Sequence, residues 1–164
     1  MEQVEIRRAE KKDIPFLVHG NRAMAKETEN KVLEESVLSR GVEAVFENEW
    51  RGFYCVAEEN GRPIGQLMIT FEWSDWRNGV FWWIQSVYVE VKYRRKGIYK
   101  RLYAFIFDQA RKDPSVCGLR LYVDKNNRRA KKVYERCGMN EAHYAMFEMD
   151  FVLSVQPEIS RRQP

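Results

Sequence analysis

The chain has 164 residues, 45% of them hydrophobic and 32% charged, with a net charge of +4 at pH 7. This length allows one domain with a full core, and the composition excludes an intrinsically disordered chain. No apolar run approaches a membrane span, no secretory signal pattern opens the chain, and three scattered cysteines fit neither a disulfide framework nor a zinc site. We therefore expect a cytoplasmic protein that contacts no membrane and binds no metal.

The first third of the chain predicts a strand followed by helix. Residues Val4–Ala9 alternate like a strand, and Asp13 is a typical helix N-cap. From residue 21 to about residue 48 the sequence is largely helix-forming. Its expected weak points are Gly20 and Gly41, because glycine disfavours a helix interior.

The middle of the chain predicts three strands. Two apolar runs, 53–57 and 64–71, flank Asn60-Gly61, a dipeptide that favours the type I′ turn of an antiparallel hairpin. After a second turn, residues 80–89 are apolar at both parities. Such a strand is covered on both faces, which places it at the centre of a sheet.

A basic turn follows this central strand and leads into a helix. Residues 94–97 read Arg-Arg-Lys-Gly, and an amphipathic pattern begins at Ile98 and ends at Asp113-Pro114. A strand, a basic turn and a helix N-terminus in this order form an anion site, because free N–H groups and the helix dipole point into the turn. A diphosphate is the natural ligand.

The last third predicts a strand, a short helix and a final strand. The strand covers residues 118–123, and an asparagine at 126–127 caps a helix that Gly138 ends at its C′ position. A final strand is expected from Ala142 to Phe151. Residues 154–164 are polar and unpatterned, so we expect a loose tail.

Two segments of this chain resemble the GCN5-related N-acetyltransferases, the GNAT superfamily. Residues 94–99, Arg-Arg-Lys-Gly-Ile-Tyr, resemble the acetyl-CoA loop [QR]-x-x-G-x-[GA] and depart from it at Tyr99. Residues 127–138 carry Asn, Ala, Tyr and Gly at the spacing N-x-x-A-x-x-x-Y-x-x-x-G, a complete match. The resemblance covers almost the whole chain except its tail.

The resemblance implies a single α/β domain over residues 1–153, followed by the tail at 154–164. Its sheet is expected to be mixed, mostly antiparallel and twisted, with helices on both faces. The strands that end near Val89 and Val123 are expected to be parallel and to splay apart, forming a cleft for coenzyme A. The implied reaction is direct transfer of acetyl from acetyl-CoA to a primary amine, without a metal.

The resemblance also implies which residues bind acetyl-CoA. Backbone groups of the turn and the helix start are expected to hold the pyrophosphate, and the preceding strand is expected to pair with the pantetheine arm. The alternative is a solvated cluster of charges. At the departing position, the Tyr99 N–H can still donate, but its ring must point away or cap the cofactor. The expected cofactor residues are Val87, Val89, Arg94, Arg95, Lys96, Gly97, Ile98, Tyr99, Lys100, Asn127 and Tyr134.

Tyr134 is the first catalytic candidate. A phenol at this position of the family pattern is expected to protonate the departing CoA thiolate, the alternative being a core tyrosine. A general base is harder to identify, because the strand before the turn has no carboxylate ahead of Glu90. Glu72 and Asp75, at the hairpin end, are the catalytic candidates for that role, and each could be a surface carboxylate instead.

Carboxylates and aromatic rings indicate a cationic acceptor. We expect a small amine, a polyamine or an amino-acid derivative rather than a protein, and a homodimeric enzyme. The alternatives are a non-catalytic CoA-binding regulatory module and a protein N-terminal or lysine acetyltransferase. A nucleic-acid binder using the basic turn is a further rival, although we expect no nucleic-acid partner. The expected acceptor residues are Glu27, Glu29, Glu72, Trp73 and Gln85.

Overall fold

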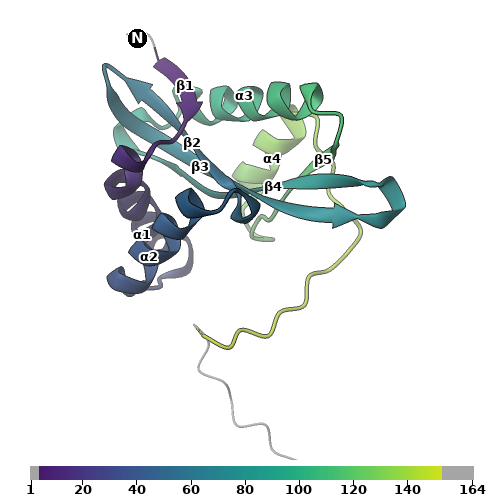
Figure 1. Cartoon of the computed structure of the whole chain (residues 1–164), viewed down its shortest axis with the longest axis horizontal. Coiled ribbons are helices and arrows are strands. Elements are labelled where there is room, and N and C mark those ends of the chain that lie inside the picture. Colours follow the sequence, from purple (N-terminus) through teal and green to yellow (C-terminus); the bar gives the residue numbers. More distant parts are fainter. Residues whose placement is uncertain (1–3, 153–164) are drawn as a thin grey trace, which may run out of the picture.

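The computed structural model describes residues 4–152, which form a five-stranded mixed sheet with helices on both faces (Figure 1). The strands lie in the sheet in chain order, with antiparallel neighbours up to β4 and a parallel pair between β4 and β5. This confirms the predicted fold class. The strands are β1 (Val4–Arg8), β2 (Phe53–Glu59), β3 (Arg62–Ser74), β4 (Gly79–Val89) and β5 (Val116–Leu121).

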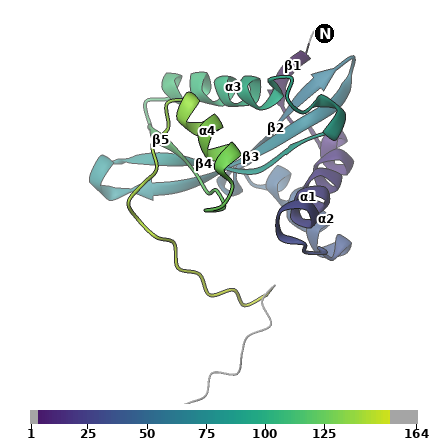
Figure 2. The same ribbon diagram turned by 180° about the vertical axis from the view of Figure 1, so that it is seen from behind.

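Helices cover the two faces of the sheet in pairs, α1 with α2 on one face and α3 with α4 on the other (Figures 1 and 2). Alternation along β2 explains both cores, because successive side chains of a strand point to opposite faces. Tyr54 and Val56 pack with α1 and α2, whereas Cys55 and Ala57 pack with α3. The helices are α1 (Ile14–Glu29), α2 (Glu35–Glu47), α3 (Ile98–Lys112) and α4 (Arg128–Arg136).

The hairpin turn is confirmed, but the expected weak points in the helical region were wrong. Asn60 and Gly61 have φ values of 52° and 74°, as a type I′ turn requires. The break between α1 and α2 starts at Asn30, whose φ of 52° ends α1 in the left-handed region. Gly20 lies inside α1 and does not break it. A glycine is needed at this position because a Cβ there would collide with the side chain of Gln66.

The predicted final strand at 142–151 is wrong for the described structure, which has no strand there. A strand needs a partner for its backbone groups, and this segment leaves the sheet and runs away from β5 (Figures 1 and 2). The predicted tail at 154–164 lies outside the described residues, and the domain boundary at 153 stays a prediction.

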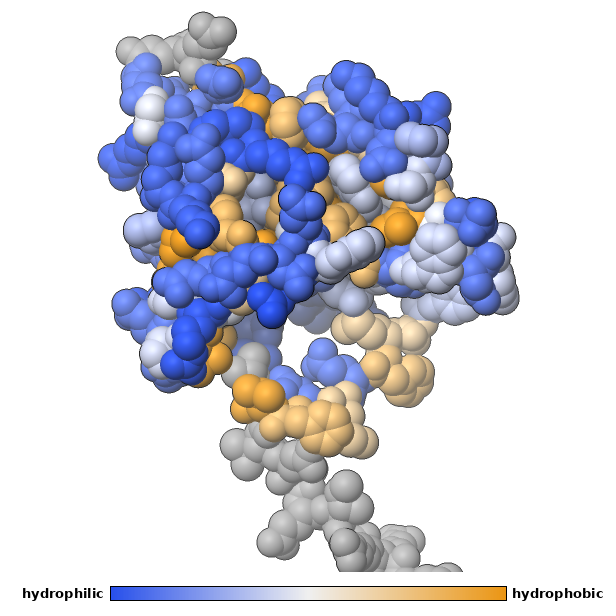
Figure 3. Space-filling model, viewed as in Figure 1, coloured by the Kyte–Doolittle hydropathy of each residue, from blue (hydrophilic) through white to orange (hydrophobic). Residues whose placement is uncertain are grey.

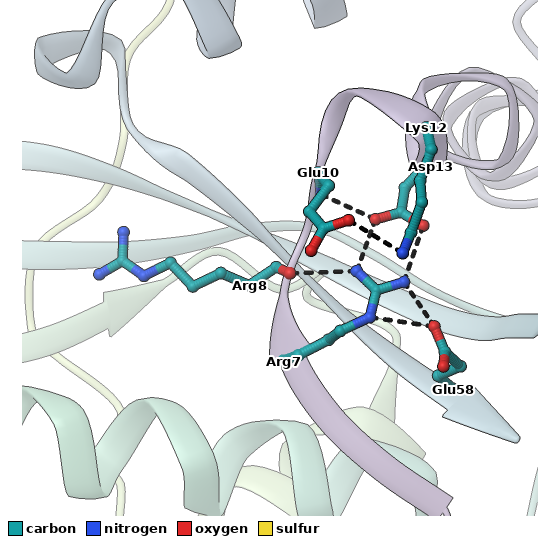
Figure 4. Close-up of polar contacts among 6 residues, drawn as sticks. All are labelled: Arg7, Arg8, Glu10, Lys12, Asp13 and Glu58. Carbon is teal, nitrogen blue, oxygen red and sulfur yellow. Dashed lines mark hydrogen bonds and ion pairs between the residues drawn. The ribbon is translucent and has the colours of Figure 1, made fainter. Parts of the chain in front are cut away.

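A charged cluster fixes the start of α1 to the sheet (Figure 4). The Arg7 guanidinium donates to both Asp13 carboxylate oxygens at 2.7 and 3.0 Å and to Glu58 Oε2. The backbone N–H of Glu10 also donates to Asp13 Oδ2, at 2.8 Å. Asp13 therefore precedes α1 as expected, but its side chain, 3% exposed, binds Arg7 instead of capping the helix.

This cluster predicts an acid-sensitive stability. Burial acts to raise the pKa of Asp13, but hydrogen bonds from Arg7 and Glu10 outweigh it and lower that pKa. The stabilisation is therefore present above the unfolded pKa, about 3.9, and is lost as pH falls below it. We expect Asp13→Asn to lower the free energy of unfolding by about 2 kcal/mol at pH 7.

Urea unfolding from pH 7 to pH 2 measures this difference. The difference in the free energy of unfolding between wild type and Asp13→Asn should become smaller below about pH 4. A gap that stays constant across this range would contradict an ionised Asp13 in the folded protein.

Candidate active site

The basic turn forms an uncapped helix N-terminus. Gly97 is the N-cap of α3 with a φ of 79°, and Arg95 also has a positive φ, 64°. No side chain caps this helix among the described residues, and a Cβ at Gly97 would meet nothing within 4 Å. The first N–H groups of α3, which have no partner inside the helix, therefore point into open space between cations.

Arg94 ties this turn to its surroundings. Its Nε donates to the Val89 carbonyl at 2.8 Å, and its Nη2 donates to the Glu27 carboxylate at 2.8 and 3.1 Å. The structure thus places Glu27 at the basic turn, although the sequence predicted it at the acceptor site. Glu29 lies near the exposed end of α1, where it pairs with Lys31 at 2.7 Å.

A bulge in β4 opens the sheet beside the turn. Ser86 has a φ of 50°, and the β3–β4 register shifts between Gln66 and Met68. Pairing between β4 and β5 ends at Ile84–Leu121, so residues 85–89, with Val87 and Val89, pair with β3 alone in the described structure. The two parallel strands separate here, as expected. The bulge itself has no clear signal in the sequence.

The Tyr99 ring points into the core, so of the two positions expected for it, away from the turn or over the cofactor, the structure has the first. It meets the Tyr134 ring edge-on at 5.7 Å and lies 6.3 Å from the Tyr103 ring. The side chain thus leaves the turn open, and only its backbone faces the anion site. Burial raises the pKa of both Tyr99 and Tyr134, so each hydroxyl keeps its proton at neutral pH.

The buried hydroxyl of Tyr99 has no hydrogen-bond partner among the described residues. We expect Tyr99→Phe to raise the free energy of unfolding by about 1 kcal/mol, because it removes a buried unpaired polar group. Thermal unfolding without coenzyme A measures this change. A lower melting temperature would show that the hydroxyl has a partner in solution.

Asn127 acts as a helix cap. Its Oδ1 accepts from the Ala130 N–H at 3.0 Å, and Gly138 follows the helix with a φ of 83°. Both terminal residues of the predicted helix are therefore confirmed.

A polar cluster occupies the open part of the sheet face that also carries α1 and α2. Glu72 pairs with Arg120 at 2.7 Å and accepts from the Trp83 indole N–H. The Arg120 guanidinium also lies 3.7 Å from the centre of the Phe81 ring. Sequence reasoning missed Arg120, although its alternation with Leu119 and Leu121, which pack against the main core, could have placed it on the opposite face.

The remaining acceptor candidates, Gln85 and Trp73, and the base candidate Asp75 lie in two places. Gln85 is half-buried and donates to Thr70 on the same face as Glu72. Asp75 and Trp73 lie at the hairpin tip, where Asp75 accepts from the Trp76 N–H at 2.9 Å. This tip is roughly 30 Å from the basic turn, because β4 rises about 3.3 Å per residue between them. The structure does not bring Asp75 to the turn.

The described residues contain neither a metal-site cluster nor a membrane-spanning helix. Nowhere in residues 4–152 do three or more His, Cys, Asp or Glu side chains gather as a metal site would require. None of the helices in that range combines the length and the apolar character needed to cross a membrane.

Comparison with known proteins identifies relatives over most of this chain. Residues 22–139 match the model of the acetyltransferase (GNAT) family. A possible acetyltransferase from Clostridium difficile has 45% sequence identity and a TM-score of 0.85, over 92% of this chain and 99% of that one. No curated protein matches.

Two more distant structures share the fold. A predicted acetyltransferase from Clostridium acetobutylicum, solved with acetyl-CoA, is 20% identical with a TM-score of 0.72, over 94% of this chain and 100% of its own. Glucosamine-6-phosphate N-acetyltransferase from Arabidopsis thaliana is 22% identical with a TM-score of 0.64, over 90% of this chain and 99% of that one.

Proposed function

This chain belongs to the acetyltransferase (GNAT) family, and from that premise we propose that it transfers acetyl from acetyl-CoA directly to a primary amine. One observation carries the proposal: the uncapped start of α3 lies beside the stretch of β4 that has lost its β5 partner. The first feature suits a diphosphate, and the second suits an extended chain that needs backbone partners. Coenzyme A contains both groups in one molecule.

In this proposal the residues of the turn and those of β4 bind different parts of coenzyme A. The N–H groups from Gly97 to Lys100 hold the pyrophosphate, and Arg95 and Lys96 add positive charge. Arg94 holds the turn in place through Val89 and Glu27. Backbone groups of Val87 and Val89 pair with the pantetheine arm, and Asn127 lies at the start of α4, which carries Tyr134.

Two groups of this chain act on the reacting atoms in our proposal. Bound acetyl-CoA supplies the activated acyl group, and alignment with the amine supplies much of the acceleration. The Tyr134 hydroxyl donates a proton or a hydrogen bond to the departing sulfur. Glu72, held by Arg120 and Trp83, attracts the cationic amine along the open sheet face. The amine loses a proton to water before it attacks the acetyl carbon, and the C–S bond breaks as the C–N bond is completed, so that the CoA thiolate leaves. Glu72 is favoured over Asp75 as the acceptor carboxylate because it lies on the open sheet face that also carries Gln85, whereas Asp75 lies at the hairpin tip.

A small amine remains the favoured acceptor, with Gln85 and Trp83 beside Glu72. The relative from Arabidopsis is named for an amino-sugar phosphate, which belongs in the same size class. A cytoplasmic location and a homodimer complete the proposal, as the sequence predicted.

A second function has support from one feature. β4 brings no carboxylate to the turn, and both Glu72 oxygens already accept hydrogen bonds from Trp83 and Arg120. A chain without a free base could bind coenzyme A as a regulatory module and turn over no amine. Protein N-terminal or lysine acetylation remains the other alternative.

Thiol release from acetyl-CoA separates these functions. The panel contains polyamines, amino-acid amides, an amino-sugar phosphate and a lysine peptide, and calorimetry measures the binding of coenzyme A in parallel. We expect small amines to raise thiol release, and Glu72→Gln to raise KM for the amine more than it changes KM for acetyl-CoA. Tight coenzyme A binding with no response to any amine would favour the regulatory module.

A further inference from the structure

A cavity of about 530 Å³ opens at the end of the sheet where β2 begins. The end of α2 bounds it on one side, and the residues that follow α3 bound it on the other. Figure 3 shows apolar side chains between hydrophilic ones over the part of the sheet that lies between α2 and α3. Small-molecule sites have volumes of about 300–1,000 Å³ and are lined mainly by apolar and aromatic side chains, with a few polar groups. This cavity has the size and the lining of such a site.

Three aromatic rings in mutual contact, here named the aromatic wall, line one side of the cavity. The Phe53 ring meets Trp82 edge-on at 5.3 Å and lies 6.2 Å from Phe71. Phe71 and Trp82 are 6.3 Å apart, and Phe71 is 36% exposed. Aromatic rings gain stability from contacts with one another at centroid distances of about 4.5–7 Å. The aromatic wall therefore favours a ligand that brings a further ring.

A fixed turn places a fourth aromatic ring, that of Trp50, at the cavity. Trp50 lies in the short 3-10 helix Glu49–Arg51, where its N–H donates to Asn48 Oδ1 at 3.0 Å and its side chain is 89% exposed. Gly52 follows with a φ of 122°, and a Cβ there would lie 1.9 Å from the Ile69 carbonyl oxygen. Only glycine permits this close approach to β3. The fold therefore presents an exposed indole ring on a well-defined backbone, as a preformed binding site requires.

Arg8 adds a cation to this aromatic lining. Its guanidinium carbon lies 3.5 Å from the centre of the Phe53 ring. Among the described residues this guanidinium has neither an ion pair nor a hydrogen bond, whereas the neighbouring Arg7 binds Asp13 and Glu58. A guanidinium stacked on a ring keeps its in-plane N–H groups free, and their fork matches the two oxygens of a carboxylate. Arg8 is therefore suited to bind the carboxylate of a ligand.

Two carboxylates, those of Glu49 and Asp113, also line the cavity. Asp113 Oδ1 accepts from the Ser115 N–H at 2.9 Å and from its hydroxyl at 2.6 Å, which leaves Oδ2 without a donor in the described part of the chain. The carboxylates would repel a ligand whose only charge is negative, and Arg8 would repel one whose only charge is positive. A ligand that carries both charges avoids both costs.

From these observations we propose that the cavity binds a free aromatic α-amino acid. The ring of the ligand packs against the aromatic wall and Trp50, and its carboxylate binds Arg8 through a pair of charge-assisted hydrogen bonds. Its ammonium group faces Glu49 and Asp113. A zwitterion with an aromatic side chain thus matches the shape, the aromatic lining and both signs of charge in this cavity.

This site is separate from the proposed coenzyme A site. Asp113 borders the cavity at the C-terminal end of α3, whereas the basic turn lies at the N-terminal end of the same helix. The 15 residues of α3 rise about 22 Å between the two places. The amino acid bound in this cavity is therefore not the acceptor of the proposed acetyl transfer, and its binding requires no acetyl-CoA.

Calorimetry on the full chain with phenylalanine, tyrosine and tryptophan, without acetyl-CoA, tests the proposal. We expect one saturable site with a Kd of roughly 0.1–1 mM for phenylalanine, as its small size allows. Arg8→Gln and Trp50→Ala should each weaken binding about 10-fold or more. The matched controls, Arg40→Gln on the exposed surface of α2 and Trp76→Ala at the hairpin tip, should leave the Kd unchanged. The absence of saturable binding, or the same Kd for wild type, Arg8→Gln and Trp50→Ala, would overturn the proposal.

Two analogues of phenylalanine test the charges on the wild-type protein, so this arm holds even if a variant fails to fold. Phenylalanine amide lacks the carboxylate, and phenylpropionate lacks the ammonium group. We expect each analogue to bind about 10-fold more weakly than phenylalanine. In Arg8→Gln the preference for phenylalanine over its amide should disappear. If either analogue binds the wild type as tightly as phenylalanine does, the cavity does not recognise a zwitterion, and the assignment to an amino acid is wrong.

Discussion

Replacing Tyr134 with phenylalanine is expected to lower kcat about 100-fold or more, with the affinity for coenzyme A close to that of the wild type. The variant keeps the ring that packs edge-on against Tyr99, so the fold should be unchanged. It removes the hydroxyl that we propose as the donor to the departing thiolate. Thiol release at saturating amine measures kcat, and calorimetry measures coenzyme A binding.

Burial of Tyr134 decides whether its hydroxyl transfers a proton to the thiolate or only donates a hydrogen bond to it. Its pKa is raised by burial, above the ordinary value of about 10, whereas a free thiol has a pKa of about 8.5. Full proton transfer to the thiolate is therefore uphill, and the hydroxyl acts mainly as a hydrogen-bond donor to the developing charge. We accordingly expect the loss in kcat to be similar from pH 6 to pH 9.

Tyr103→Phe is the matched control for Tyr134→Phe. Tyr103 is buried on α3, and its hydroxyl donates to the Cys137 carbonyl at 3.3 Å. The two variants thus lose the same atom from two rings that both contact Tyr99, but only Tyr134 belongs to the proposed catalytic group. Equal activities for the two variants would indicate that Tyr134 is structural, or that water protonates the thiolate.

Local sequence patterns predicted most of the fold because local physics determines those elements. Asn60-Gly61 determined the hairpin turn, and period-2 and period-3.6 patterns located the strands and α3. The errors lie where tertiary contacts decide. The glycine at position 20 reads as a helix breaker, yet its role is to let α1 approach Gln66. Residues 142–151 read as a strand, but among the described residues they pair with no strand of the sheet, and a strand forms only where an edge receives it.

In the candidate site, too, the parts that are contiguous in the sequence were predictable and the contacts between distant residues were not. The basic turn and the Asn127 cap are contiguous patterns, and each formed where the sequence placed it. The contacts that shape the site join distant residues: Glu27 with Arg94, and Glu72 with Arg120. No spacing in a single sequence encodes such pairs, because each depends on how helices and strands pack.

The largest effect on coenzyme A binding is expected from a charge at Gly97. Gly97→Asp places a carboxylate at the start of α3, where the proposed pyrophosphate binds. Two unit charges 4 Å apart repel by about 1 kcal/mol in water and about 4 kcal/mol at an effective dielectric of 20. We therefore expect a 10- to 100-fold loss of affinity for coenzyme A, measured by calorimetry at low salt.

Gly97→Asn isolates that charge. Asparagine and aspartate have nearly the same shape, and both tolerate the left-handed conformation that Gly97 adopts with its φ of 79°. Steric and backbone costs are thus shared, and only the carboxylate differs. Thermal unfolding should give the opposite order to binding, because a negative charge at a helix N-terminus stabilises the helix while it repels the diphosphate. If Asp and Asn weaken binding equally, the start of α3 does not hold the pyrophosphate, and the anion site inferred from the basic turn must lie elsewhere.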